Sequence, residues 1–350
     1  MTSSPPLRLT LDGDALVANW RWFKAQSGGA ACGAAVKADG YGLGGREVVA
    51  RLAAAGARDF FVATWAEAEA LGPLPAGAVL SVLHGVRAED MATALAFPAR
   101  PVLNSVAQVA RWKEAGGGAC DVMVDTGMNR LGLTPEQAAS GLLDGLEVDT
   151  LHSHLACADE PGHPLNAAQL ERFRALRQSV EAARYSLANS AGILLGRDYA
   201  FDLTRPGLGL YGGVPSPIAE GHVRPVVGIE AQVLQVRDVA EGESVGYGAE
   251  WSTDRASRIA ILNLGYADGL LRRFANEARA VMHDDPFETF ETAGRISMDL
   301  MAIALGERAR LAEGDWVKIH YDVQRLATIT GLSQYELLTV LGQRFERRWL

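Results

Sequence analysis

Polar side chains end most of the short apolar runs in the first two thirds of the chain. The run that ends at Lys37 continues into the glycine-rich segment ADGYGLGG. A lysine at the edge of an apolar site loses part of its hydration, which favours its neutral, nucleophilic amine. Because a neutral amine can condense with a carbonyl group, Lys37 is a candidate nucleophile. The other runs end in His84, Asn104, Asp125, His154, Asn189 with Ser190, and Arg205.

Glycine-rich turns after two of these runs could bind an anion. Ser190 begins one of them, in ANSAG, and Arg205 precedes the other, in LTRPGLGLYG. Such turns expose backbone N–H groups, which suit a phosphate. A lysine, an arginine and phosphate-binding turns together favour a site for pyridoxal 5'-phosphate (PLP). The alternative is that Lys37 only extends into water, as most lysines at strand ends do.

Alternating strands and helices are predicted to position these residues. Eight apolar runs between residues 31 and 212 are separated by amphipathic or alanine-rich stretches. Eight parallel strands close a TIM-type (β/α)8 barrel, with its chemistry at the carboxyl ends of the strands. An open doubly wound sheet is the alternative. We predict an α/β protein with a barrel over residues 10–223.

A different pattern begins near residue 224. Strand-like runs separated by turns, one of them spanning residues 291–305, are followed by two short helices. We therefore predict a mostly β domain over residues 224–350, with which residues 1–9 could pair. Arg344, Arg347 and Arg348 are expected to form a solvated tail.

Composition narrows the function classes. The chain has 350 residues and a net charge of −9, which argues against nucleic-acid and anionic-membrane binding. Its three cysteines are widely spaced, which argues against disulfides and structural zinc. His152 and His154 could form half of a metal site, but no third ligand has matching spacing, so no metal is expected. With no secretory signal and no membrane-spanning run, the expected location is the cytoplasm.

A set of longer motifs resembles the bacterial alanine racemases, PLP enzymes with an N-terminal barrel and a C-terminal β domain. The likeness covers nearly the whole chain. The resemblance implies an isomerase, EC 5.1.1.1, that interconverts L-alanine and D-alanine for cell-wall peptidoglycan and works as a homodimer. The motifs are AVKADGYGLG, DTGMNRLG, HSHLACADE, ANSAG, TRPGLGLYG, VGYGAEW, LGYADGLLRR and GRISMDL.

The resemblance also implies a two-base mechanism. Lys37 would hold PLP and move the α-proton on the D-alanine face, and Tyr247 would be the base on the L-alanine face of the partner's site. Racemisation needs an acid and a base on opposite faces of the substrate, so one lysine cannot serve both. His154 and Arg205 would flank the cofactor. The remaining implied contacts are Tyr41, Asn189, Ser190, Gly207 and Leu208 for the cofactor, Arg130 and the Met298 backbone for the substrate carboxylate, and Tyr266 and Arg272 at the entrance.

Two positions depart from the family pattern. Met123 replaces a lysine that is carbamylated in many relatives, so Arg130 needs another anion or partner. Gly342 lies about where many relatives have a phosphate-contacting tyrosine. The alternatives left open are a serine or broader-specificity racemase and a non-catalytic PLP carrier. Such carriers lack a second domain. The segment around Tyr247 indicates that this chain has one, which argues against the carrier alternative.

Overall fold

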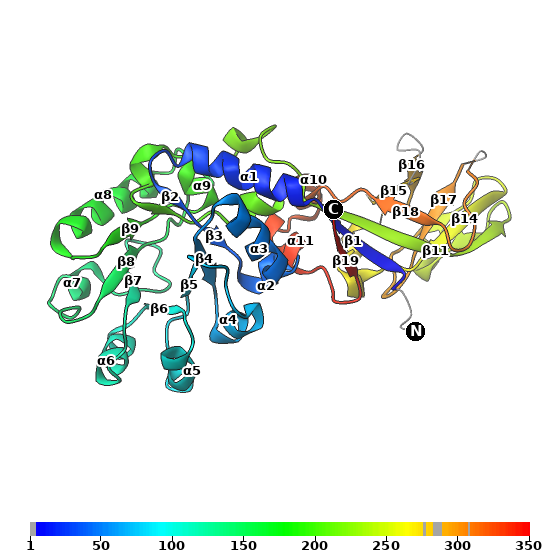
Figure 1. Ribbon diagram of the computed structural model, residues 1–350. Helices are drawn as coiled ribbons and strands as arrows, with labels where there is room; N and C mark the ends of the chain where they lie inside the picture. The colour runs from blue at the N-terminus through cyan, green and yellow to red at the C-terminus, as the bar shows by residue number, and fades with distance from the viewer. Residues whose placement is uncertain (1–4, 276–277, 283–288, 307–308) are drawn as a thin grey trace. The chain divides into compact units, whose positions relative to one another are not determined.

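The computed structural model describes residues 5–275, 278–282, 289–306 and 309–350, which form two units (Figure 1). One unit is Ala15–Arg224. The other joins Met1–Asp14 to Pro225–Leu350. The predicted class, an α/β barrel with a mostly β second domain, is confirmed. The N-terminal division falls after Asp14 rather than at residue 10, because β1 (Leu7–Leu11) pairs with strands of the second unit.

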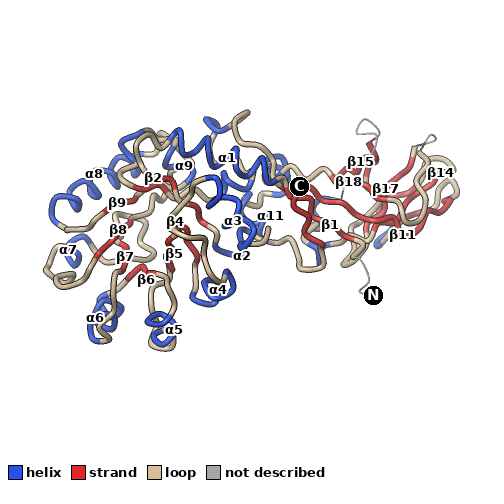
Figure 2. The backbone as a smooth tube through the Cα atoms, viewed as in Figure 1, coloured by secondary structure: helices blue, strands red, loops and turns tan. Residues whose placement is uncertain are grey.

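Parallel strands form the wall of the first unit (Figure 2). One pair, β2 (Ala31–Cys32) with β10 (Leu203–Thr204), joins two strands of only two residues each. The strand predicted over residues 31–37 is interrupted at Gly33, between β2 and the next strand. Only glycine fits there, because a Cβ atom would lie 2.6 Å from the Asp59 carbonyl oxygen. The other seven strands are paired in chain order: β3 (Ala34–Ala35), β4 (Asp59–Val62), β5 (Val79–Val82), β6 (Arg100–Leu103), β7 (Cys120–Met123), β8 (Val148–His152) and β9 (Arg184–Ser186).

Backbone hydrogen bonds around β10 close these strands into a ring. On one side the Gly33 N–H donates to the Thr204 carbonyl oxygen over 2.9 Å. On the other side the Arg205 N–H donates to the Ala188 carbonyl oxygen over 2.9 Å. The architecture is therefore a closed barrel and not the open sheet that the sequence left as an alternative.

Helices cover the outside of these strands (Figure 2). Several begin after a residue whose hydroxyl accepts a backbone N–H three positions later, as Thr64, Ser105 and Thr134 do. These three helices therefore begin directly after the loops that follow their strands. The helices are α1 (Gly13–Gln26), α3 (Gly45–Ala55), α4 (Trp65–Leu71), α5 (Met91–Ala96), α6 (Val106–Glu114), α7 (Pro135–Ala138), α8 (Pro164–Ser179) and α9 (Ser190–Ile193). The segment labelled α2 (Lys37–Tyr41) is a turn without regular helical geometry.

The second unit is built on one long strand, β11 (Val227–Val239), which pairs with β1, β14 and β18. Two short helices, α10 (Val323–Thr330) and α11 (Gln334–Thr339), follow as predicted. The other strands are β12 (Ser244–Val245), β13 (Trp251–Ser252), β14 (Ser257–Leu262), β15 (Arg279–Met282), β16 (Thr289–Glu291), β17 (Met301–Leu305), β18 (Trp316–Ile319) and β19 (Glu346–Trp349).

Two expectations for this unit were wrong. The basic C-terminal segment is not a solvated tail, because β19 pairs in parallel with β1 and the Arg344 Nε donates to Asp268 over 2.6 Å. The run over residues 291–305 is not one strand. Between β16 and β17 the chain turns at Gly294, whose φ of +78° is in the left-handed region that glycine tolerates best.

Candidate active site

The segment directly after Lys37 is a left-handed turn. Ala38, Asp39, Gly40 and Tyr41 have φ angles of 53°, 53°, 63° and 57°. Left-handed geometry costs a non-glycine residue roughly 1–2 kcal/mol, so the turn must be held by its surroundings. Glu67 holds it by accepting the Ala38 N–H over 3.0 Å, and the Asp39 carboxylate accepts the Gly45 N–H over 2.7 Å. The turn therefore fixes the backbone positions of Lys37 and Tyr41, from which their side chains extend.

Lys37 lies at the carboxyl end of β3 and is exposed there. Surrounding protein atoms still remove enough water from its ammonium group to lower its pKa. The positive charges of Arg130 and Arg205 lower that pKa further, against an opposing effect of Glu67. The sequence prediction of a lysine with a depressed pKa therefore agrees with its surroundings.

Arg205 is buried, with 6% of its surface exposed, in the wall of the barrel. Its Nη1 donates to the Ser186 hydroxyl, and its Nη2 donates to the Ser153 carbonyl oxygen over 2.6 Å. Burial lowers the pKa of Arg205 to about 10, so the guanidinium remains charged at neutral pH. Its Nε has no hydrogen bond recorded within the described ranges and can donate to a bound acceptor.

His154 follows β8 and lies within the electric field of the same cations. Burial, with the charges of Arg205, Arg130 and Lys37, lowers the pKa of His154 to about 3. The imidazole is therefore neutral at physiological pH. His154, Lys37, Arg130 and Arg205 are thus brought close enough to interact electrostatically.

This histidine makes stability depend on pH. The pKa of His154 is depressed in the folded state, and an unfolded histidine titrates near 6.5, so the unfolded chain binds the extra proton first. We expect the urea midpoint to fall as the pH drops from about 7 to 5, and His154→Gln to reduce that slope. His84→Gln, at an exposed position, should leave it unchanged. Equal slopes in all three proteins would contradict the assignment.

A second group of predicted site residues is joined by hydrogen bonds around Ser190. The Ser190 Oγ accepts the Gly207 N–H over 2.8 Å and the Gly209 N–H over 3.3 Å, so its own hydrogen is available to donate. Leu208 begins the adjacent 3-10 turn, Leu208–Tyr211. The Tyr41 ring stacks on Tyr211 with a centroid separation of 4.5 Å. Asn189 has a structural task, because its Oδ1 accepts the Gly192 N–H over 2.8 Å at the start of α9.

Gly207 is required by the close approach of Tyr41. A Cβ atom at residue 207 would lie 2.4 Å from the Tyr41 Oη. Gly207→Ala is expected to displace that tyrosine and to lower the free energy of unfolding by about 1–3 kcal/mol. Urea denaturation would measure the change, with Gly29→Ala as the control because no atom lies within 4 Å of its added Cβ. A variant as stable as the control would show that Tyr41 moves without cost.

Arg130 is exposed on a loop that Asp125 organises. The Asp125 carboxylate accepts the N–H groups of Gly127, Met128 and Arg130 over 2.7, 2.9 and 2.9 Å. Although burial acts in the opposite direction, these N–H groups lower the pKa of Asp125. No carboxylate is recorded as a partner of the Arg130 guanidinium within the described ranges. Met123 is buried in the wall and its thioether is uncharged, so it supplies no anion for Arg130.

The second unit carries the remaining predicted residues. Tyr247 and Met298 are largely exposed, at 68% and 54%. The Met298 carbonyl oxygen accepts the Ala267 N–H over 2.9 Å, which ties its loop to the turn that carries Tyr266. The Arg272 guanidinium lies 6.0 Å from the Tyr266 ring centroid.

Gly342 lies against that same turn. Its N–H donates to the Asp268 carbonyl oxygen over 3.1 Å, and a Cβ atom there would lie 3.1 Å from the Ala267 carbonyl oxygen. A tyrosine at this position would therefore require the turn to shift.

Sequence reasoning missed the buried polar residues behind Arg205. The Asp121 carboxylate, 1% exposed, accepts the Ser81 hydroxyl over 2.5 Å, and its Oδ2 lies 3.5 Å from the His152 Nε2. Burial lowers the pKa of His152, so the ring is neutral. An aspartate inside the apolar run CDVMV is the signal that could have revealed this group.

The described part of the chain contains neither a candidate metal cluster nor a candidate membrane-spanning helix. No cluster of three or more His, Cys, Asp or Glu side chains there could hold a metal ion. No helix in that part combines the length and apolar character needed to cross a bilayer.

Comparison with known proteins places the chain in a family. Residues 11–215 match the family model "Alanine racemase, N-terminal domain", and residues 226–349 match "Alanine racemase, C-terminal domain". The alanine racemase of Acidiphilium cryptum is 42% identical over 351 residues, covering 97% of each chain. The biosynthetic alanine racemase of Agrobacterium fabrum is 41% identical, covering 99% of this chain and 94% of the relative.

Solved structures agree with this placement. The alanine racemase of Bartonella henselae, described with covalently bound pyridoxal phosphate, has a TM-score of 0.89 and 32% identity, covering 99% of this chain and 100% of the other. The biosynthetic alanine racemase of Pseudomonas aeruginosa has a TM-score of 0.86 and 34% identity, with the same coverage. The chain belongs to the alanine racemase family.

Proposed function

We propose that the chain is a PLP-dependent alanine racemase, EC 5.1.1.1, that interconverts L-alanine and D-alanine and supplies D-alanine for peptidoglycan. The observation that carries the proposal is the set of residues gathered at the mouth of the barrel. There Lys37 has a depressed pKa beside the charged Arg205, and the Ser190 hydroxyl, whose oxygen accepts the Gly207 N–H, can donate its hydrogen to an anion. We expect the activity in the cytoplasm, where three free cysteines are ordinary.

These residues fit PLP. Lys37 would bind its carbonyl carbon, the Arg205 Nε would donate to the pyridine nitrogen, and the Ser190 hydroxyl would donate to the phosphate. Arginine keeps its proton at neutral pH, so Arg205 would orient the ring without protonating it. Bound PLP makes the α-hydrogen of an amino acid acidic by withdrawing electrons from the α-carbon.

Two side chains would then move the proton. Inversion requires removal from one face of the α-carbon and delivery to the other, and we assign Lys37 to the D-alanine face and Tyr247 to the L-alanine face. The neutral Lys37 amine, favoured by its lowered pKa, can accept a proton. Arg130 and the Met298 backbone would hold the substrate carboxylate.

A homodimer would complete the site. Tyr247, Met298 and Leu300 expose 68%, 54% and 38% of their surface on neighbouring segments, which suits contact with a second copy of the chain. We propose that Tyr247 acts in the partner's site. Tyr266 and Arg272 would line the entrance.

Chiral chromatography after incubation of L-alanine with the PLP-loaded protein tests the activity. We expect rapid formation of D-alanine and slow turnover of L-serine, L-lysine and L-arginine run in parallel. Rapid turnover of several amino acids would establish a broader racemase. Bound PLP with no inversion of any substrate would instead favour a carrier.

A further inference from the structure

Tyr247 lies at the tip of a small hairpin that is separate from the main sheet. Its two strands, β12 and β13, pair through Ser244 with Ser252 and Val245 with Trp251. The tip has three residues in left-handed geometry, Gly246, Gly248 and Ala249, with φ angles of 81°, 78° and 50°. Ala249 is not a glycine, so this conformation is costly unless other contacts hold the tip.

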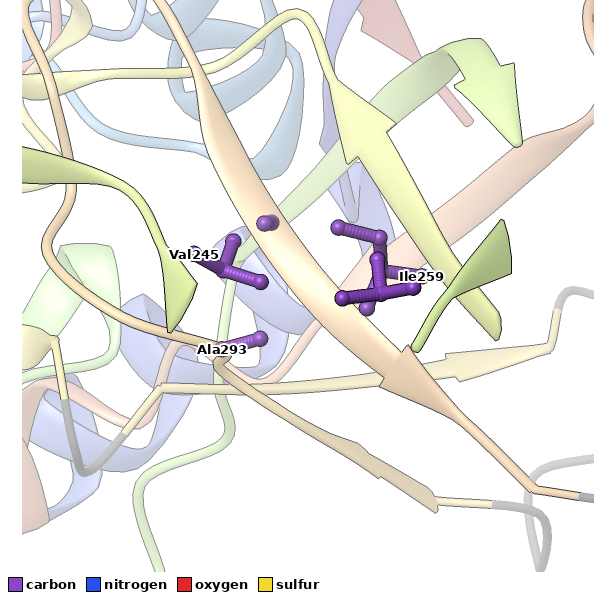
Figure 3. Packing of buried hydrophobic residues seen from close by; sticks show 5 residues of the cluster. Val245, Ile259 and Ala293 are labelled. Atoms are coloured by element: carbon purple, nitrogen blue, oxygen red, sulfur yellow. The ribbon is translucent and has the colours of Figure 1, made fainter. Parts of the chain in front are cut away.

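The base of the hairpin is anchored by apolar packing. Val245 belongs to a buried cluster with Val239, Ile259, Ala293 and Ala302, and Trp251 packs against that cluster. Figure 3 shows the Val245, Ile259 and Ala293 side chains gathered in this cluster. A Cβ atom at Gly294 would lie 2.4 Å from the Val245 carbonyl oxygen. The backbone around residue 294 therefore lies directly against the base of the hairpin.

The tip is held by a different contact. The Arg295 Nε donates to the Glu250 Oε2 over 2.5 Å, and a second bond joins Nη2 to Oε1. A Cβ atom at Gly248 would lie 3.4 Å from the Arg295 Nη1, so the guanidinium also lies beneath the turn. For residues 246–250, this pair is the only side-chain hydrogen bond or ion pair recorded within the described ranges.

We propose that the Arg295–Glu250 pair positions Tyr247, an inference that rests on the proposed function. A simple exposed ion pair contributes little to stability, but two parallel bonds from a planar guanidinium also fix an orientation. Arg295 lies three residues before Met298, so one short segment sets both the Tyr247 tip and the backbone assigned to the substrate carboxylate. The pair acts through Tyr247 and does not itself touch the reacting atoms.

Hydrogen exchange at the α-carbon distinguishes positioning of Tyr247 from a general contribution of the ion pair to the stability or activity of the enzyme. Each enantiomer of alanine is incubated in deuterium oxide with the PLP-loaded enzyme, and α-deuterium is followed by NMR. In Arg295→Met and Glu250→Gln we expect exchange from L-alanine to fall at least about tenfold, because a displacement of about 1 Å can cost on the order of 100-fold. Exchange from D-alanine, which we assign to Lys37, should stay within about twofold of its original rate.

A charge swap tests the pairing directly. Arg295→Glu combined with Glu250→Arg should recover much of the L-alanine exchange that either single change removes. Arg279→Met is the matched control, because it breaks another exposed ion pair of the same unit, Arg279 with Glu291 at 3.7 Å. This control should leave both exchange rates unchanged.

The possible results are distinct. Equal losses for both enantiomers, or no loss for either, would overturn the positioning role. The unsubstituted enzyme should exchange the α-hydrogen of both enantiomers, and exchange of neither would overturn the proposed function and this inference with it.

Discussion

Lys37→Ala is expected to lower alanine racemisation by roughly 10³-fold or more, the largest effect of any single substitution considered. The change removes the group assigned both to hold PLP and to move a proton, and proton transfer alone contributes about 10²–10⁴-fold. The same variant should lose covalent attachment of PLP, which borohydride reduction followed by mass spectrometry would detect on the peptide that contains residue 37.

Lys24→Ala provides the matched control, because Lys24 is an exposed lysine on α1 whose ammonium lies over the Trp20 ring. It should retain full activity and covalent PLP. If Lys37→Ala still racemised alanine at a rate comparable to that of the unsubstituted enzyme, the catalytic role assigned to Lys37 would be wrong.

Tyr247→Phe is expected to lower racemisation in both directions by about 10²–10⁴-fold while PLP remains bound. The substitution deletes one oxygen from a side chain that is 68% exposed, so the fold and the cofactor contacts should not change. Activity and the visible absorbance of bound PLP, measured on the same sample, would separate loss of the base from loss of the scaffold.

Tyr335→Phe serves as the comparison, since this tyrosine is also exposed, at 43%, and lies in the same unit. It should behave like the unsubstituted enzyme. Normal racemisation by Tyr247→Phe would rule out the two-base assignment, whereas parallel loss of activity and of bound PLP would assign the tyrosine to the cofactor site.

The alternation of eight strands with helices was sufficient to predict parallel βα units, and the family resemblance favoured the barrel over an open sheet. The sequence also placed Lys37, His154, Arg205 and Ser190 at one edge, since parallel strands bring their carboxyl ends together. The left-handed turn after Lys37 could not be predicted. Alanine and aspartate rarely adopt that geometry, and it forms here because Glu67 and Gly45, distant or downstream in sequence, hold it.

The second unit was harder to predict, since its short pieces depend on partners far along the chain. β19 is formed by charged residues whose pairing with β1 no local pattern reveals. The buried Asp268, 1% exposed, accepts hydrogen bonds from Gly265 and from Arg344, and only the folded chain brings these groups together. The hairpin that carries Tyr247 has two residues in each strand, too few to produce an alternating pattern.

The pairing of β2 with β10 has a consequence for local opening of the barrel. Two residues on each side are paired at this junction, as in the other short pairings of the barrel, so it should open more readily than the four-residue pairing of β4 with β5. Lys37 follows one side of the junction and Arg205 follows the other. A cofactor held by both would bridge it, and a ligand that binds only the closed form stabilises it by mass action. Loading the enzyme should therefore slow amide exchange of Leu203, Thr204, Arg205 and Gly207, so that the molecule that serves the chemistry would also stabilise the closed form of the barrel wall.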